Sequence, residues 1–417
     1  MYSRRQLFGL TAAATAALTL PRRARAATAA NRKFIFVYAQ GGWDPTRVFA
    51  DGFDHDGVDM ELSAERASAG GIAYVDHADR PSVRAFFEAH HARAVVLNGV
   101  MVRSIAHEIC TMISMTGTSS GVAPDWPAVI ASRQGASLIL PHLVLGGPSF
   151  PGDLGVGVAR TGSNGQLEAL LSGESLELND LVLRALRRPS QQRVDQFVAG
   201  RAAARAGAAH NATEARLTGD FQSAVEHMQA LKDLQYEMDF STSGDLESQL
   251  PVAIDALTRG VSRCVTLSGG TAGTWDTHAA NDDLQSPLWE SLFAGLLQLQ
   301  ARLEATEGDD GGTLADQTTV VVLSEMGRTP ALNGFSGKDH WPFTSVLLFG
   351  DGLAGDRTVG SWDENWYGRP VDPASAEVDE AGQTLSAEAV GATLLALADI
   401  DPGAYVSGVE PLTGVLA

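Results

Sequence analysis

The chain has 417 residues, of which 50 are acidic and 30 are basic, so its formal net charge is −20 at pH 7. An acidic surface of this size repels nucleic acid and anionic lipid, and we exclude both as partners. The length allows one large domain or two ordinary ones, and Cys110 and Cys264 lack the spacing of a metal-binding cysteine motif.

The N-terminus is typical of an export signal. Residues 3–8 (SRRQLF) form a twin-arginine signature, a short apolar run follows, and residues 24–26 (ARA) form a cleavage site. We therefore predict a twin-arginine signal peptide over residues 1–26 and a mature domain over 27–417, which the twin-arginine export machinery delivers to the periplasm or beyond. The alternative is a basic amphipathic helix that stays in the mature protein. No later run is apolar for about 18 residues, so we expect no stable membrane insertion.

Strand-like and helix-like patterns alternate along the mature chain. This alternation predicts an α/β fold, a doubly wound and mostly parallel sheet with helices on both faces. The predicted strands are 33–39, 94–100, 142–145, 264–268, 318–323 and 345–349, and the predicted helices are 81–91, 105–115, 286–305 and 387–400. About sixty residues within 176–240 break the alternation with an almost wholly helical pattern rich in Ala, Arg, Gln and Glu. We expect a helical insertion there that packs on the sheet domain or caps it.

Polar side chains follow four of the predicted strands. The motif GGWD follows the first strand, His107 the second, WDTH the fourth, and SEMGRTP with KDHWP the fifth. Because the carboxyl ends of parallel strands meet at one edge of a sheet, we expect these side chains to lie close together. Carboxylates and imidazoles are ligands of divalent metal ions. The candidate ligands are Asp44, Asp276, His278, Glu325, Asp339 and His340.

Each of these residues also has a reading without a metal. A single aspartate after a strand, such as Asp44, is more often a helix cap or a turn former. His107 could be a hydrogen-bonded structural histidine, and Asp339 with His340 could order a loop. Four such clusters at one sheet edge together favour a metal site, with enough ligands for two divalent ions.

The twin-arginine leader, GGWD, WDTH and SEMGRTP with KDHWP resemble the exported domain-of-unknown-function family 1501 over essentially the whole mature chain. That family is placed in the alkaline phosphatase and sulfatase superfamily. The resemblance implies an alkaline phosphatase-like α/β fold with a two-metal site, in which Asp44 is the acid after the first strand. It also implies that Asp276, His278 and His340 bind one metal, and that Glu325 stands where the superfamily has Asp.

The chain departs from the superfamily pattern at several positions. Met326 stands where the superfamily has a metal-binding His, and a thioether is a poor ligand for Zn²⁺, Mg²⁺ or Ca²⁺. No Ser, Thr or Cys occupies an unmistakable nucleophile position after the second strand, where Ser104, His107 and Thr111 are the candidates. We favour His107 as a ligand or an acid–base group.

Arg328 is a cation within the SEMGRTP motif. Its guanidinium could clamp a phosphate or sulfate group, or it could pair with Glu325 or another acid of the site.

These patterns favour an exported metal-dependent hydrolase that acts on a small-molecule or polymeric phosphate or sulfate ester. His107 and Arg328 are the predicted catalytic residues, with divalent ions, two in number, as cofactor. The alternative is a non-catalytic metal-binding protein of the envelope or of surface assembly. The sequence leaves open the substrate, the metal, the nucleophile and whether Cys110 pairs with Cys264.

Overall fold

The computed structural model describes residues 31–133, 138–154, 157–161, 188–234, 237–240, 242–309 and 311–417. The predicted signal peptide, residues 1–26, lies outside the described residues, as do residues 176–187 of the predicted helical insertion. Within the described parts of the chain, no helix has the length and apolarity needed to cross a bilayer.

The central sheet runs in the order β12-β4-β11-β8-β1-β7-β5-β6 within the described residues. All neighbouring strands are parallel except β11, which is antiparallel to both β4 and β8. The predicted α/β class with a mostly parallel sheet is therefore confirmed. The strands are β1 (Lys33–Tyr38), β4 (Ala94–Met101), β5 (His142–Val144), β6 (Val158–Arg160), β7 (Cys264–Ser268), β8 (Thr318–Leu323), β11 (Phe343–Gly350) and β12 (Arg357–Val359).

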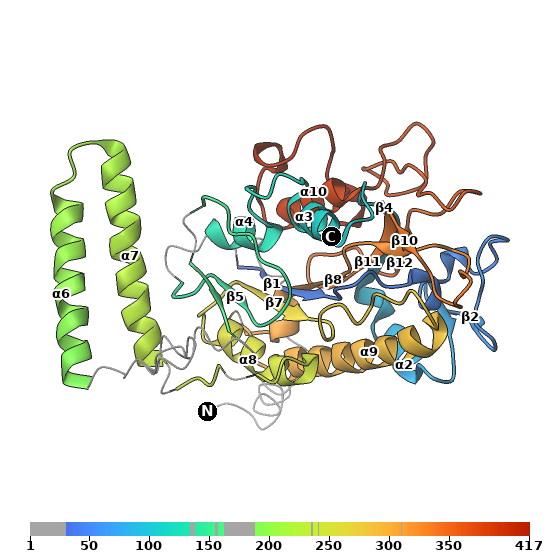
Figure 1. The fold of residues 1–417 in the computed structure, drawn as a ribbon, viewed down its shortest axis with the longest axis horizontal. Coiled ribbons are helices and arrows are strands. Elements are labelled where there is room, and N and C mark those ends of the chain that lie inside the picture. Colours follow the sequence, from blue (N-terminus) through green and yellow to red (C-terminus); the bar gives the residue numbers. More distant parts are fainter. Residues whose placement is uncertain are drawn as a thin grey trace, which may run out of the picture.

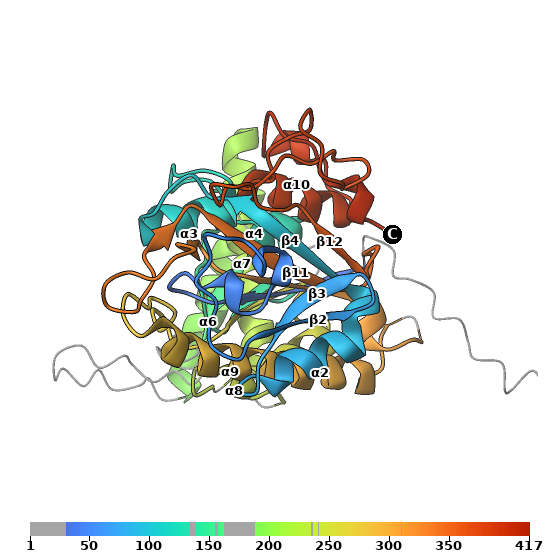
Figure 2. The same cartoon turned by 90° about the vertical axis from the view of Figure 1, so that its right-hand side faces the viewer.

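Helices cover both faces of this sheet (Figures 1 and 2). The strand β1 shows why, since its alternate side chains enter two separate cores: Ile35 and Val37 one, Phe34 and Phe36 the other. One core contains α2 (Pro81–His90), α8 (Leu246–Thr258) and α9 (Asn281–Ala305). On the opposite face lie α3 (His107–Thr116), α4 (Trp126–Ser132) and α10 (Ala387–Leu397).

Two small sheets lie beside the central one. The hairpin of β2 (Glu65–Ala69) and β3 (Ile72–Asp76) is antiparallel, as is the short pair of β9 (Gly327–Arg328) and β10 (His340–Trp341). The second pair matters for the site because it joins the SEMGRTP motif to the KDHWP motif.

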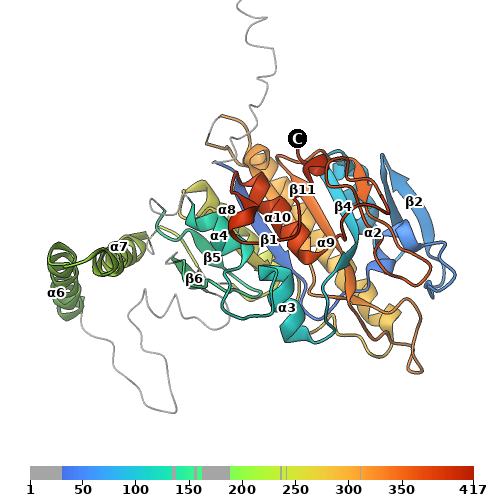
Figure 3. The same cartoon turned by 90° about the horizontal axis from the view of Figure 1, so that it is seen from above.

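Two long antiparallel helices, α6 (Arg188–Gly207) and α7 (Ala212–Leu234), form a hairpin beyond the β5–β6 end of the sheet (Figures 1 and 3). The base of α7 joins the main core through Leu231. The rest of the hairpin stands beside the domain, so among the described residues the insertion projects outward instead of capping the sheet.

Candidate metal centre

Four loops and one helix meet at one edge of the central sheet. The parallel strands β1, β4, β7 and β8 all end at this edge, and the antiparallel strand β11 begins there. The loop after β1 carries Asp44, α3 after β4 begins with His107, and the loop after β7 carries Asp276 and His278. Glu325 directly follows β8 and His340 precedes β11, so the topology brings widely separated motifs together.

Three imidazoles gather around the carboxylate of Asp276. Its Oδ1 lies 3.0 Å from Nε2 of His278 and 3.1 Å from Nε2 of His340. Its Oδ2 lies 3.4 Å from Nε2 of His107. The Nε2 atoms of His278 and His340 are 3.0 Å apart. Each histidine therefore presents the same ring nitrogen to one point.

The other ring nitrogen of His107 is held by a buried acid. Nδ1 of His107 lies 2.9 Å from Oε1 of Glu325, which is wholly buried and also accepts a hydrogen bond from the backbone N–H of Gly41. A carboxylate is an acceptor, so Nδ1 carries the proton, and Nε2, which is buried without a hydrogen-bond partner, carries the lone pair. The same hydrogen bond raises the pKa of His107, with burial acting in the opposite direction.

His278 and His340 are oriented in the same way. Nδ1 of His278 lies 3.2 Å from the Asp339 carboxylate, and Nδ1 of His340 lies 2.8 Å from the carbonyl oxygen of Ile105. Both partners accept hydrogen bonds, so each Nδ1 carries the ring proton. The lone pairs on the two Nε2 atoms then face each other across 3.0 Å. Two lone pairs at that separation repel unless a proton or a cation lies between them.

The spacing of these atoms fits a metal ion. Tetrahedral ligands at about 2.0–2.1 Å from a zinc ion lie about 3.3 Å from one another. The contacts of 3.0–3.4 Å around Asp276 match that separation. The ligand atoms of His107, Asp276 and His340 all lie within 4.8 Å of one another, and Nε2 of His278 lies 3.0 Å from both Asp276 and His340. Histidines whose second nitrogen is held by a carboxylate or a carbonyl are typical of metal ligands.

The buried side chain of Arg328 holds the carboxylate of Asp276 in place. It is wholly buried, and its guanidinium donates to the carbonyl oxygens of Gly42 and Lys338, at 2.7 and 3.1 Å, and of Gly41 and Trp275. Its Nη2 also donates to Asp276 Oδ1 at 2.6 Å. Burial raises the pKa of Asp276, but the hydrogen bonds from Arg328 and His340 outweigh it and lower that pKa to about 2. Of the two roles open to Arg328 in the sequence, the structure shows the pairing with a site acid, here Asp276.

Asp44 lies in a separate buried network. Its carboxylate meets Nζ of Lys338 at 2.9 Å, Nε of Arg47 at 3.6 Å and the side-chain amide of Asn281 at 2.8 Å. It also caps the short 3₁₀ turn Pro45–Arg47 by accepting from the backbone N–H of Thr46. Burial acts to raise the pKa of Asp44, but Lys338 and Arg47 hold it well below its ordinary range.

Asp44 therefore does not join the group around Asp276. With two cations beside it, its carboxylate is already neutralised, and the cap that sequence reasoning offered as the alternative is what forms. Among the described residues, the ligands that lie close enough together to hold an ion are those around Asp276, and the expected number of two ions stays a prediction.

Sequence reasoning missed Lys338, which is wholly buried against Asp44. It stands in the KDHWP motif directly before Asp339, and a lysine inside a signature rich in site residues was the available signal. Three buried tryptophans fix the loops from below: Trp43 stacks on Trp289 of α9, and Trp275 packs edge-on against both. Each loop tryptophan directly precedes an acid, Asp44 or Asp276, so its anchoring sets where that acid lies.

The nucleophile candidates have other partners. Oγ1 of Thr111 accepts a hydrogen bond from the Tyr38 hydroxyl at 3.2 Å, and Oγ of Ser104 accepts from the backbone N–H of Ala106. Met326 is wholly buried in a small apolar cluster with Val102 and Cys110. Met326 is thus a core residue.

Fold and site together define an α/β protein with a histidine–carboxylate centre, suited to a metal ion, at the carboxyl edge of a mostly parallel sheet. The chain belongs to the DUF1501 family, described as a protein of unknown function, whose model matches residues 31–405. No curated protein matches the chain.

Several solved structures resemble it weakly. The C-terminal periplasmic domain of EcEptC from Escherichia coli, in complex with Zn, is 7% identical, with a TM-score of 0.35 over 77% of this chain and 73% of that one. A mutant of TAB5 alkaline phosphatase with Mg bound is 8% identical, with a TM-score of 0.35 over 80% of this chain and 94% of that one. The phosphonate monoester hydrolase of Agrobacterium radiobacter is 11% identical, with a TM-score of 0.31 over 91% and 78%. At these values the likeness carries no argument about activity.

Proposed function

We propose that this protein is an exported, metal-dependent hydrolase of phosphate or sulfate esters, related to the alkaline phosphatase and sulfatase superfamily. One observation carries the proposal: three Nε2 lone pairs converge on the Asp276 carboxylate, with each Nδ1 held by an acceptor. Three ring nitrogens whose lone pairs face one point destabilise the folded protein unless a cation lies between them, because the lone pairs repel one another.

In this proposal Asp276, His278 and His340 hold the ion, Asp339 and Arg328 orient His278 and Asp276, and Glu325 orients His107. A bound divalent ion would lower the pKa of a water molecule and offset negative charge on an ester oxygen. The acidic surface of the protein makes such a local positive centre necessary for an anionic substrate, since the net charge is −20.

His107 is the proposed proton-transfer group. Its Nδ1 is fixed by the buried Glu325, its Nε2 faces the centre, and the Glu325 hydrogen bond raises its pKa. Once its Nε2 has taken up a proton on the lone pair, His107 can give that proton to the departing ester oxygen. Because Thr111 and Ser104 have partners other than His107, we propose that water, and not a side chain, attacks.

The test combines metal analysis with turnover. We expect purified wild-type protein to hold roughly one divalent ion per chain, and His278→Ala or His340→Ala to lose it together with its thermal stabilisation. His210→Ala, an exposed histidine at the tip of the helical hairpin, is the matched control and should keep the ion. Unchanged metal content in both site variants would remove these residues from the proposed centre.

Activity is assayed with a panel of aryl phosphate and aryl sulfate esters. His107→Ala should lower turnover while it leaves the folded protein intact. Mass spectrometry of protein trapped with substrate would contradict water attack if it found a phosphorylated or sulfated Thr111 or Ser104.

The second candidate is a non-catalytic metal-binding protein of the envelope. The burial of Met326 in an apolar cluster favours it, because a ligand position of the superfamily has become part of the core. A protein that holds the ion but hydrolyses no ester of the panel would support this second function. Export itself is tested by fusing residues 1–26 to a reporter that needs the twin-arginine route.

A further inference from the structure

The α6–α7 hairpin exposes an unusual share of apolar surface. Phe197 on α6 is 68% exposed, and Leu217 and Phe221 on α7 are 55% and 48% exposed. Val194 and Met228 are exposed as well. No other helix of the described chain carries more than one exposed large apolar residue. Side chains of this size gathered on one supersecondary unit indicate an interaction surface.

The apolar residues of α7 follow a coiled-coil spacing. Leu217, Phe221, Ala224, Met228 and Leu231 recur at alternating steps of four and three residues. This is the pattern of a helix whose seam packs against other helices. Leu231 at the base is buried in the main core, whereas the other seam residues, Leu217, Phe221, Ala224 and Met228, are exposed. The seam therefore continues beyond the part that the domain covers.

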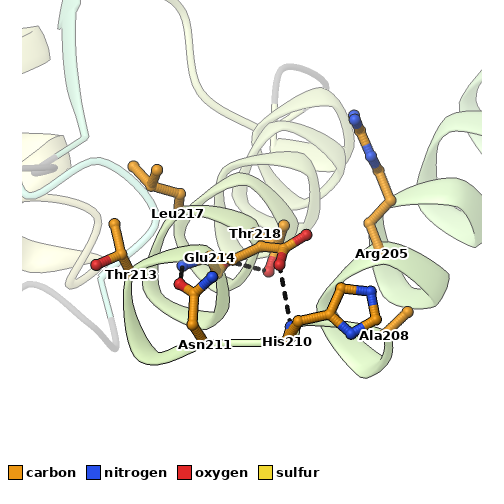
Figure 4. Close-up of a pocket in the computed structure, with 8 residues that line it drawn as sticks. All are labelled: Arg205, Ala208, His210, Asn211, Thr213, Glu214, Leu217 and Thr218. Atoms are coloured by element: carbon orange, nitrogen blue, oxygen red, sulfur yellow. Dashed lines mark hydrogen bonds between the residues drawn. The ribbon is translucent and has the colours of Figure 1, made fainter.

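The tip of the hairpin is well formed. Asn211 caps α7 by accepting from the backbone N–H of Glu214 at 2.8 Å, and Glu214 accepts from the backbone N–H of His210 at 3.0 Å (Figure 4). Leu217 lies just below this cap, at a hollow of about 510 Å³ that Arg205 also lines. The first turn of α7 is therefore capped by hydrogen bonds, and the exposure of the apolar residues next to it is not a result of fraying.

The two helices carry opposite charge. The α6 sequence has four arginines and one aspartate, whereas α7 has four acids and two cations. One contact within the hairpin, between Asp195 of α6 and Lys232 of α7 at 2.8 Å, joins residues whose charges are opposite to the net charge of their own helices. Arg193, Arg201 and Arg205 are exposed on α6, and Asp220 and Glu226 are exposed on α7.

We propose that the hairpin is a dimerisation arm whose occupant is a second copy of this chain. Two hairpins pack face to face as a four-helix bundle about a two-fold axis along the helices, which sets basic α6 of each copy against acidic α7 of the other. The apolar stripe of α7 then lies in the bundle core. Charge complementarity favours this occupant, because a surface with both signs and the same apolar seam is complementary to itself.

The size of the hairpin suits such an interface. A helix of 23 residues, the length of α7, is about 35 Å long, and two helix diameters are about 20 Å wide. One face of the hairpin therefore offers about 700 Å², close to the roughly 800 Å² per partner of a standard stable interface.

Sedimentation equilibrium of the full mature chain tests the proposal. We expect wild-type protein to be a dimer and Phe221→Glu to raise its dissociation constant at least about a hundredfold, since each dimer loses two buried phenylalanine rings. Phe335→Glu is the matched control, because Phe335 is 80% exposed in a loop of the sheet domain, and it should leave the dimer unchanged. A monomeric wild-type protein, or equal effects of the two variants, would overturn the proposal.

Two further variants keep the test independent of folding. Cys110 and Cys264 are both buried, so Leu217→Cys introduces an accessible thiol, and a short bifunctional thiol reagent should link two copies through it. Arg193→Glu should weaken the dimer several-fold, and the double variant with Glu226→Arg should restore it, because both residues are exposed and each lies 14 residues from the hairpin end of its helix. Binding of the hairpin to vesicles by a monomeric protein, or failure of the charge swap to restore dimerisation, would argue against a second copy as occupant.

Discussion

Replacement of Lys338 by methionine should destabilise the protein by about 3–5 kcal/mol, the cost of removing one partner from a buried ion pair. Both side chains of the Lys338–Asp44 pair are wholly inaccessible, and Nζ lies 2.9 Å from the carboxylate. In Lys338→Met the Asp44 carboxylate keeps Arg47 at 3.6 Å and the Asn281 amide at 2.8 Å, so the lower end of that range is expected.

The size of the domain converts this energy into a melting temperature. An unfolding entropy of about 2.1 cal/mol/K per residue over about 390 residues makes each kcal/mol worth about 1.2 °C, so Tm should fall by about 4–6 °C. Thermal and urea unfolding, followed by circular dichroism, measure the loss.

Two controls decide whether the buried charge is the cause. Arg216→Met breaks an exposed pair with Asp220 on α7 and should cost less than about 1 kcal/mol. The double variant Asp44→Asn with Lys338→Met removes both charges and should recover at least half of the loss. If Lys338→Met costs no more than Arg216→Met, or if the double variant is as unstable as the single one, the carboxylate is not the source of the effect.

Three more predictions concern other buried groups. Glu325→Gln, which removes the charge behind His107, should lower the turnover of an aryl ester about 10–100-fold, and unchanged turnover would show that Glu325 does not tune His107. Burial lowers the pKa of His142 to about 3, so the stability that its neutral form contributes is present above about pH 6.5 and is lost as the pH falls toward 3. In His142→Gln the unfolding free energy should therefore depend less on pH in that window, by up to about 1.4 kcal/mol per pH unit. Parallel curves of unfolding free energy against pH for the two proteins would contradict this prediction. Burial raises the thiol pKa values of Cys110 and Cys264 to about 11 and about 12, so neither should react with a thiol reagent until the protein unfolds. Because both thiols are free, the electrophoretic mobility of the protein should not depend on reductant.

The sequence predicted the sheet well because buried parallel strands are continuous apolar runs. The predicted strands 264–268 and 318–323 match β7 and β8 at both ends, whereas β6 and β12, whose residues are mostly half-buried, were not predicted. Predicted helix 286–305 begins five residues earlier, at Asn281, because Pro287 lies inside α9 instead of in its first turn. The helix α8 also contains a proline, Pro251, and was not predicted.

The sequence predicted only part of the candidate site, because topology can be inferred from a sequence pattern whereas side-chain direction cannot. His278 and His340 could be placed together because each belongs to a loop at the same sheet edge, which is a matter of topology. The direction in which Asp44 points depends on its own turn: the Pro45–Thr46 pair after it is typical of a cap, and that local preference decided the outcome. The hydrogen bonds of His340 to the Ile105 carbonyl and of Arg328 to several carbonyl oxygens could not be predicted from the sequence, because they use backbone atoms that every residue has.

The residues around Asp276 come from segments between His107 and His340, which span more than half of the chain. A nascent chain that has not yet reached His340 cannot assemble the centre, because one of its three imidazoles is still missing. Contacts of such long sequence separation form late in folding. Under the proposed function, the ion is therefore captured by a completed domain and not by a fragment. For a protein predicted to cross the membrane already folded, the choice of metal is then made from the ions of the compartment of synthesis, before export changes which ions are at hand.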